Sequence, residues 1–241
     1  GVCVQAAHCG TGDAVDQARA ALGDVDGTVL VLYGDCPLIQ TRTLEELTAT
    51  LNDSAVSVLG FEAKDPARYG RLITDGDKLK RIVEFKDASP EERAVTLCNS
   101  GVMAAPANLL FDLLSEIDTD NASGELYLTD VVGKAVARGL QCAAVRCAER
   151  ETLGVNSRVE LMQAEKEFQN LRRAEALEDG VLMPAPETVH FSFDTVIGRD
   201  TVIEQNVVFG PGVTVESGAQ IRAFSHLEGA HVARGCVVGP Y

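Results

Sequence analysis

The chain has 241 residues, of which 46% are hydrophobic and 24% charged, so it can form one large or two modest domains with a buried core. Asp and Glu number 36 against 21 Lys and Arg, and the formal net charge of −15 argues against general binding to nucleic acid or to an anionic membrane. Its apolar runs are too short to span a bilayer. Seven cysteines without zinc-type spacing and without a signal peptide before them predict reduced thiols in a cytoplasmic protein.

Residues 1–157 alternate short apolar runs with helical patterns, which predicts an α/β domain with a largely parallel sheet. We expect an apolar strand at residues 2–4, and further strands at 29–33, 55–59, 100–104 and 142–146. Helices are expected to start near Asp13 and at Thr43, and to cover 108–117 and 130–138. Thr43 begins a Thr-x-x-Glu pattern, and we expect it to cap its helix. The turn 75–77 between two apolar runs predicts a hairpin.

Residues 158–178 carry apolar side chains at helical spacing on one face, which predicts one long amphipathic helix that connects two domains. From residue 195 the period changes to six. The apolar residues that recur at this interval, and that we expect to point inward, are Ile197, Ile203, Phe209, Val215, Ile221 and Leu227. The next step, to Val232, is five residues. This period is typical of a hexapeptide β-helix.

Asp35 follows the apolar run 29–33, at the carboxyl end of a predicted buried strand, where ligands of open α/β sheets bind. A carboxylate there suits Mg²⁺, which takes one or two protein oxygens together with substrate phosphates. The alternative is that Asp35 only caps the turn before Pro37, and position alone leaves the two about even.

Other polar residues stand beside apolar runs. The Gly-Thr-Gly at residues 10–12 lies at a turn into a helix, where backbone N–H groups approach a ligand closely, although most such turns only change the chain direction. A Gly, a Glu and two Asn, at Gly70, Glu84, Asn99 and Asn156, suit hydrogen bonds to sugar hydroxyls and an acetamide. Taken singly, each is more readily explained as a turn residue.

The segments occur in a specific order along nearly the whole chain. They are Gln-x4-Gly-Thr-Gly, Leu-Tyr-Gly-Asp-x-Pro-Leu, Tyr-Gly-Arg, Ile-Val-Glu-x-Lys-Asp, Asn-Ser-Gly, Gly-Glu-x-Tyr-x-Thr-Asp, Gly-Val-Asn-x-Arg and the hexapeptide tail. In this order they resemble the bacterial bifunctional enzymes that make UDP-N-acetylglucosamine. Those enzymes join an N-acetylglucosamine-1-phosphate uridylyltransferase domain to a glucosamine-1-phosphate N-acetyltransferase domain.

The resemblance implies a fold, a reaction and partners. The fold is a Rossmann-like nucleotidyltransferase domain (1–157), a linker helix (158–187) and the start of a left-handed hexapeptide β-helix (188–241). The reaction is uridylyl transfer from UTP to N-acetylglucosamine 1-phosphate, which gives UDP-N-acetylglucosamine and pyrophosphate without a covalent enzyme intermediate. Mg²⁺ is the implied cofactor, acetyl-CoA the substrate of the second domain, and the parent is a homotrimer. No side chain is assigned as a catalytic acid, base or nucleophile.

The resemblance also implies roles for particular residues. Contacts to uridine fall on Gln5, Gly10 and Thr11. The nucleotide diphosphate would lie along Tyr33, Gly34 and Asp35. Contacts to N-acetylglucosamine fall on Gly70, Glu84 and Asn99. Asp35 and Asn156 are the implied ligands of Mg²⁺.

Two features of the family are missing from the sequence. Its Gly-rich Leu-x-x-Gly-x-Gly-Thr-x-Met phosphate loop is not present, and the catalytic His and acetyl-CoA contacts of the acetyltransferase would follow residue 241. We therefore expect a fragment of a longer protein, which puts both activities of the 241 residues by themselves in question. The alternatives are another sugar-1-phosphate nucleotidyltransferase with a β-helix tail, or a non-catalytic trimerisation module.

Overall fold

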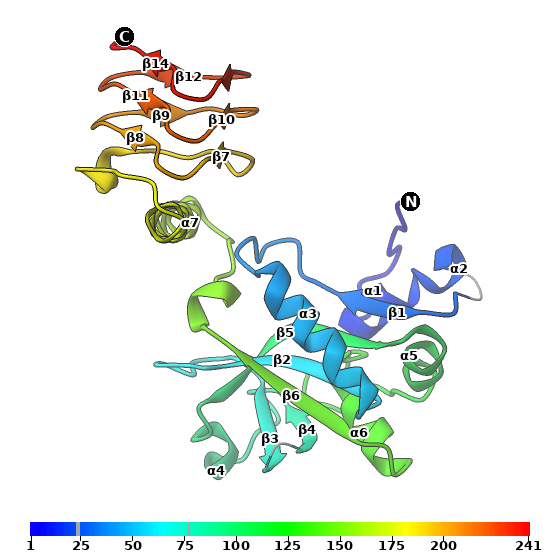
Figure 1. Ribbon diagram of the computed structural model, residues 1–241. Helices are drawn as coiled ribbons and strands as arrows, with labels where there is room; N and C mark the ends of the chain where they lie inside the picture. The colour runs from blue at the N-terminus through cyan, green and yellow to red at the C-terminus, as the bar shows by residue number, and fades with distance from the viewer. Residues whose placement is uncertain (23–24, 77) are drawn as a thin grey trace. The chain divides into compact units, whose positions relative to one another are not determined.

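A computed structural model of the chain describes residues 1–22, 25–76 and 78–241 (Figure 1). It divides into two compact units, Gly1–Val155 and Asn156–Tyr241, which are described separately below. The long helix lies within the second unit. The finer division into 1–157, 158–187 and 188–241 stays a prediction.

The described part of the first unit contains a six-stranded mixed sheet with the order β1-β5-β2-β6-β4-β3 (Figure 1). The strands are β1 (Thr28–Val31), β2 (Val56–Glu62), β3 (Arg71–Asp75), β4 (Lys78–Val83), β5 (Leu97–Pro106) and β6 (Cys142–Cys147). β3 and β4 form the predicted hairpin, although Asp77 in its turn lies outside the described residues.

The expectation of a largely parallel sheet is wrong. Among the pairings within residues 1–22, 25–76 and 78–155, only β2 and β6 are parallel. β5 runs between β1 and β2 and is antiparallel to both. β1 and β2, which α3 (Thr41–Ala49) joins, run in the same direction, as a helical crossover requires, but β5 is inserted between them in the opposite direction. The segment from the hairpin to β5 holds the one-turn helix α4 (Pro90–Arg93).

Helices cover both faces of this sheet. They are α1 (Thr11–Asp16), α2 (Arg19–Leu22), α3 (Thr41–Ala49), α5 (Ala107–Leu114) and α6 (Asp130–Ala137), with short 3₁₀ turns η1 (Thr50–Asn52) and η2 (Glu149–Thr152). Successive strand residues point to opposite faces, so Val58 packs with apolar residues of α5 and α6, whereas Leu59 packs with Leu47 of α3. Each face therefore has its own apolar core.

Two local expectations are wrong. The run Val2–Val4 forms no strand: Val2 is 92% and Val4 76% exposed, because no strand of the described residues pairs with it. Thr43 does not cap its helix, because α3 begins at Thr41 with Gln40 as the N-cap residue. The hydroxyl of Thr43 is instead buried and donates a hydrogen bond to Glu151, 108 positions along the chain.

The second unit begins with α7 (Arg158–Glu178), which confirms the predicted helix. Ser157 caps it by accepting a hydrogen bond from the backbone N–H of Glu160. The short 3₁₀ turn η3 (Pro186–Thr188) follows. The remaining strands are β7 (Val196–Ile197), β8 (Val202–Ile203), β9 (Val208–Phe209), β10 (Thr214–Val215), β11 (Gln220–Ile221), β12 (His226–Leu227), β13 (His231–Val232) and β14 (Val237–Val238).

These strands stack in parallel into a β-helix, as Figure 1 shows. Val196 pairs with Thr214, 18 positions later, so one coil contains three six-residue repeats. Thr214 pairs with His231 after only 17 positions, and the shorter coil thus absorbs the missing residue after Leu227. Five of the six residues expected to point inward are buried, and Ile197 in the first coil is half-buried. The β-helix prediction is confirmed.

Side chains of α7 cover the edge of the first coil. Gln169 is buried, donates to the carbonyl of Phe191 at 2.7 Å and accepts from its N–H at 2.9 Å. Arg173 donates to the carbonyl of Val189 and Arg172 to that of Thr195. Solenoids need such caps, because an end coil otherwise leaves backbone groups unpaired. Within the described chain, α7 and the other helices lack the combination of length and apolarity that a membrane-spanning helix requires.

Candidate active site

The Gly-Thr-Gly turn is held by a segment far along the chain. Gly10 has φ of +116°, and a Cβ there would lie 2.5 Å from the carbonyl oxygen of Leu126, so only glycine fits. The N–H of Leu126 donates to the carbonyl of Cys9, and the N–H of Gly12 donates to the carbonyl of Leu126. The turn and residue 126 are thus paired as if they were neighbouring strands.

Gln5 and Thr11 complete this loop. Gln5 is half-buried and its Nε2 donates to the carbonyl of Gly10 at 3.0 Å and to Oδ2 of Asp13 at 2.6 Å. Thr11 is the first residue of α1, and its Oγ1 accepts a hydrogen bond from the N–H of Leu128. The structure therefore brings together Gln5, Gly10 and Thr11, the three residues for which uridine contacts are predicted.

Gly70, Glu84 and Asn99 also lie together, although each comes from a different segment. The carbonyl of Gly70 accepts a hydrogen bond of 2.8 Å from the N–H of Asn99. A Cβ at Gly70 would lie 3.3 and 3.4 Å from the two carboxylate oxygens of Glu84 and 3.5 Å from Cβ of Asn99. The predicted sugar-contacting residues therefore form one cluster.

Tyr33 packs on the backbone next to this cluster. Gly101, with φ of +85°, faces its ring: a Cβ there would lie 2.3 Å from Cε2 of Tyr33. The N–H of Gly101 donates to Oδ1 of Asn99 at 3.0 Å. Burial raises the pKa of the Tyr33 phenol above its ordinary 10.0, and the negative charges of Glu84, Cys36 and Asp35 raise it further.

Glu84 is a half-buried carboxyl group. Burial raises its pKa above the ordinary 4.5, and the charges of Asp130 and Asp87 add to this rise, whereas the hydrogen bond from Thr129 lowers the pKa. The hydroxyl of Thr129 donates to Oε1 of Glu84 at 3.1 Å. Burial likewise raises the pKa of Asp130, with a further contribution from Asp118.

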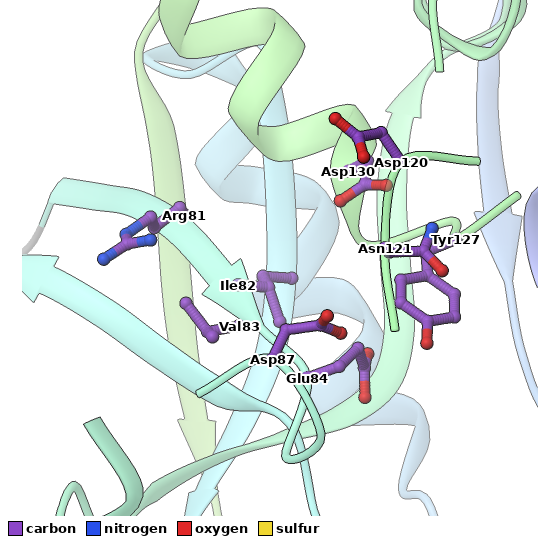
Figure 2. Close-up of a pocket in the computed structure, with 9 residues that line it drawn as sticks. All are labelled: Arg81, Ile82, Val83, Glu84, Asp87, Asp120, Asn121, Tyr127 and Asp130. Carbon is purple, nitrogen blue, oxygen red and sulfur yellow. The ribbon is translucent and has the colours of Figure 1, made fainter. Parts of the chain in front are cut away.

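A pocket of about 210 Å³ opens beside Glu84 (Figure 2). Three of its sides come from the β4 strand, from residues 120–121 and from the start of α6. Its lining residues are Arg81, Ile82, Val83, Glu84, Asp87, Asp120, Asn121, Tyr127 and Asp130. Figure 2 shows the carboxylates on the same side as Tyr127, with Arg81 at the opposite end. The pocket is polar and thus suits a ligand rich in hydroxyl groups.

Asp35 lies in the turn after β1. Its side chain is exposed, and one of its carboxylate oxygens is 3.8 Å from Sγ of Cys36. Its backbone carbonyl accepts a hydrogen bond of 2.8 Å from the N–H of Val155. Gly34 is exposed, and a Cβ there would meet no atom within 4 Å. Asn156 is the first residue of the second unit, where its N–H donates to Glu160. The predicted metal role of the pair Asp35 and Asn156 stays a prediction.

The residues 126–130 and Gly101 are the positions that sequence reasoning missed. Leu126 and Leu128 hold the Gly-Thr-Gly turn, and Thr129 holds Glu84. Both Thr129 and Gly101 stand inside motifs that the sequence displays, Gly-Glu-x-Tyr-x-Thr-Asp and Asn-Ser-Gly. Their place in those motifs is the signal that could have marked them.

Part of the second unit matches a described family model. Residues 194–229 match the family model "Bacterial transferase hexapeptide (six repeats)". This match covers the coils in which the six-residue period is most regular, and it supports the β-helix from sequence as well as from structure.

Comparison with curated proteins covers nearly the whole chain. It is 62% identical over 237 residues to "Bifunctional protein GlmU" of Roseobacter denitrificans, which covers 98% of this chain and 53% of that protein. It is 61% identical over 240 residues to "Bifunctional protein GlmU" of a Ruegeria species, which covers 100% of this chain and 54% of that protein. The chain is similar to about half of a GlmU protein.

The GlmU relatives confirm the resemblance that the ordered motifs indicate. The chain spans about half the length of the curated GlmU proteins that it matches. A solved structure, the nucleoside-diphosphate-sugar pyrophosphorylase from Vibrio cholerae RC9, is 14% identical, with a TM-score of 0.48 over 67% of this chain and 66% of that chain.

Proposed function

We propose that the GlmU-like protein to which this chain belongs transfers a uridylyl group from UTP to N-acetylglucosamine 1-phosphate. The products are UDP-N-acetylglucosamine and pyrophosphate. The observation that carries the proposal is the cluster of Gly70, Glu84 and Asn99, which three separate segments build next to Tyr33. One short segment connects this cluster to the Gly-Thr-Gly turn, because Leu128 binds Thr11 and the adjacent Thr129 binds Glu84.

In this proposal the Gly-Thr-Gly turn binds the nucleotide. The half-buried amide of Gln5 reads the edge of uracil through its Oε1, because its Nε2 already donates to Gly10 and Asp13. The close packing of Gly10 against the backbone of Leu126 holds this loop in place. Tyr33 and Gly34 border the diphosphate, where the open space above Gly34 leaves room for phosphate oxygens.

The polar cluster binds the sugar. A carboxylate at Glu84 accepts hydrogen bonds from sugar hydroxyls, and Asn99 offers its amide N–H groups, because its Oδ1 already accepts from Gly101. Gly70 lets the ring lie close to Glu84, since any larger residue would stand within 3.5 Å of both neighbours.

Mg²⁺ is the proposed cofactor, and the donor set fits it. The exposed carboxylate of Asp35 is a hard oxygen donor, and Mg²⁺ is commonly held by one or two carboxylates together with substrate phosphates. Within the described part of the chain, no three His, Cys, Asp or Glu side chains gather as a complete metal site, so Asp35 would share the ion with substrate oxygens. Asn156 is the proposed second protein ligand. When bound, the ion neutralises phosphate charge.

The chain's own residues then position the reactants. A phosphate oxygen of the sugar phosphate attacks the α-phosphorus of UTP, and pyrophosphate leaves, so no residue has to form a covalent bond. The Gly-Thr-Gly turn and the cluster of Gly70, Glu84 and Asn99 align the two substrates. Such alignment is a large part of the rate enhancement available to this kind of transfer.

The remaining expectations belong to the same proposal. The parent protein would also acetylate glucosamine 1-phosphate with acetyl-CoA, through residues outside this sequence, and would assemble as a homotrimer through its β-helix. A reducing, cytoplasmic location agrees with the seven cysteines, all of which are free.

The test is pyrophosphate release by the full-length parent protein with Mg²⁺, UTP and N-acetylglucosamine 1-phosphate. We expect turnover with this pair, and a marked preference over glucose 1-phosphate and over thymidine triphosphate. A preference for another sugar or base would favour the alternative sugar-1-phosphate nucleotidyltransferase. No pyrophosphate release with any pair would favour a trimerisation module.

A further inference from the structure

Glu151 is a buried carboxylate whose place in the fold the proposed chemistry does not explain. It lies in η2 and is only 3% exposed. Its Oε2 accepts a hydrogen bond of 2.6 Å from the hydroxyl of Thr43 and one of 3.4 Å from the N–H of Gln40. No ion pair within the described residues involves Glu151, so the carboxylate is held by α3 alone.

Both donors to Glu151 lie at the N-terminus of α3. Gln40 is the N-cap residue of α3 and Thr43 stands in its first turn. A negative charge at a helix N-terminus is favourable, and it partly offsets the cost of burying a carboxylate. A contact made only for packing would not require a charge here, since an apolar side chain of the same size would avoid that cost.

The same two segments meet a second time. The N–H of Val155, four residues after Glu151, donates to the backbone carbonyl of Asp35, five residues before Gln40. The side-chain contact of Glu151 and the backbone contact of Val155 therefore close one small ring of chain, with Asp35 inside it. If the Glu151 contact is lost, the backbone hydrogen bond from Val155 to Asp35 remains as the second closure of this ring.

We propose that Glu151 is a positioning residue, which fixes the Asp35 turn through α3 and Val155 so that the Asp35 carboxylate faces the metal and phosphates in one orientation. This inference rests on the proposed function. It assigns Glu151 no contact with substrate, and it explains why a carboxylate is buried where an apolar residue would pack as well.

The experiment uses the full-length parent protein. Glu151→Gln and Thr43→Val weaken the proposed contact with little change in shape. Glu149→Gln is the matched control, because Glu149 belongs to the same turn but its carboxylate accepts from Lys64 and not from α3. Thr43→Ser keeps the hydroxyl donor and should lie nearer to the wild type than Thr43→Val.

Three quantities are measured for each variant. The first is hydrogen–deuterium exchange of the peptide that contains the Val155 amide, which reports the ring without reference to activity. The second is the Mg²⁺ concentration for half-maximal uridylyl transfer, and the third is the KM for the sugar phosphate. We expect Glu151→Gln and Thr43→Val to raise exchange about tenfold and half-saturating Mg²⁺ at least threefold, with the sugar KM within twofold. The double variant should be no worse than the poorer single variant, because both changes break one contact.

The outcomes separate the two proposals. If the unaltered parent protein releases no pyrophosphate, the proposed function fails. If the parent is active but neither variant changes Val155 exchange, Glu151 does not hold the ring and the positioning role is overturned. Faster exchange together with an unchanged Mg²⁺ requirement would also overturn it, because Glu151 would then be structural only.

Discussion

The hydroxyl of Thr129 donates a hydrogen bond of 3.1 Å to Oε1 of Glu84. This bond joins the segment that holds the Gly-Thr-Gly turn to the carboxyl group at the centre of the polar cluster. It also stabilises the charged form of Glu84 against burial and the nearby charges of Asp130 and Asp87, which all act in the opposite direction. The balance of these effects sets how Glu84 contributes to the pH dependence of stability in the first unit.

Glu84 should make the folding stability of the chain depend on pH. Its pKa is raised in the folded state, so the folded chain binds this proton more tightly than the unfolded chain does. The resulting stability is present below the ordinary pKa of 4.5 and is lost as the pH rises through the raised value. We expect Glu84→Gln to gain stability relative to the wild type as the pH rises above 4.5, the ordinary pKa of the group. Urea unfolding at a series of pH values measures this difference.

Glu45→Gln, at an exposed position of α3, is the control for that experiment. Glu45→Gln should change the free energy of unfolding by less than about 0.5 kcal/mol, because it replaces an exposed side chain. A difference between Glu84→Gln and the wild type that shrinks as the pH rises would show that burial does not raise the pKa of Glu84.

Gly101→Ala should destabilise the first unit, because Gly101 has a positive φ and its missing Cβ makes room for the ring of Tyr33. A left-handed backbone position and a steric overlap together cost about 2–4 kcal/mol. Gly133→Ala is the matched control: Gly133 is in α6 with no atom within 4 Å of a new Cβ, and alanine there should stabilise the helix by roughly 0.5–1 kcal/mol. Relative to the wild type, the free energy of unfolding should fall in Gly101→Ala and rise in Gly133→Ala. A Gly101→Ala variant as stable as the wild type would contradict the described contact.

Gln169→Ala should loosen the cap of the β-helix. The change removes two hydrogen bonds to the backbone of Phe191 and leaves a buried N–H and a buried carbonyl unpaired, at a cost of about 2–4 kcal/mol. Gln163→Ala, at an exposed position of the same helix, should change the free energy of unfolding by less than about 0.5 kcal/mol. Hydrogen exchange of the first coil tests whether the cap is lost. Faster exchange in this coil is expected in Gln169→Ala and not in Gln163→Ala.

The periodicity of the sequence was sufficient to predict the long helix and the β-helix of the second unit. An α-helix and a six-residue coil each bury side chains at a fixed interval, so the spacing in the sequence predicts both the bounds of α7 and the inward residues from Ile203 to Leu227. Pairings between distant segments leave no such period. The antiparallel β5 is therefore not visible in the alternation of strands and helices.

The site shows the same limit at the level of single residues. Motif order singles out Gly70, Glu84 and Asn99 on three separate segments, and the structure brings these residues into one cluster. The Thr-x-x-Glu pattern at Thr43 predicts a local cap, but the tertiary contact with Glu151 satisfies that hydroxyl instead. A local pattern cannot identify a partner more than 100 positions away, and the residues that hold the site are of this kind.

The central claim is that Asp35 contributes a carboxylate to metal-assisted uridylyl transfer, and Asp35→Ala in the full-length parent protein tests it most directly. We expect the rate of uridylyl transfer to fall by about a thousandfold or more, because a charged ligand that faces the phosphates is lost. Asn156→Ala should cost less, since water replaces a neutral oxygen more readily than a carboxylate. Asp53→Ala, an exposed Asp after η1, is the control and should leave the rate within about twofold.

The decisive measurement is the rate of pyrophosphate release by Asp35→Ala, with acetyl transfer by the same preparation as the internal standard. The account predicts that uridylyl transfer is lost while acetyl transfer is nearly unchanged. Uridylyl transfer within a few-fold of the unaltered protein would contradict it, and Asp35 would then be a residue that only caps the turn after β1.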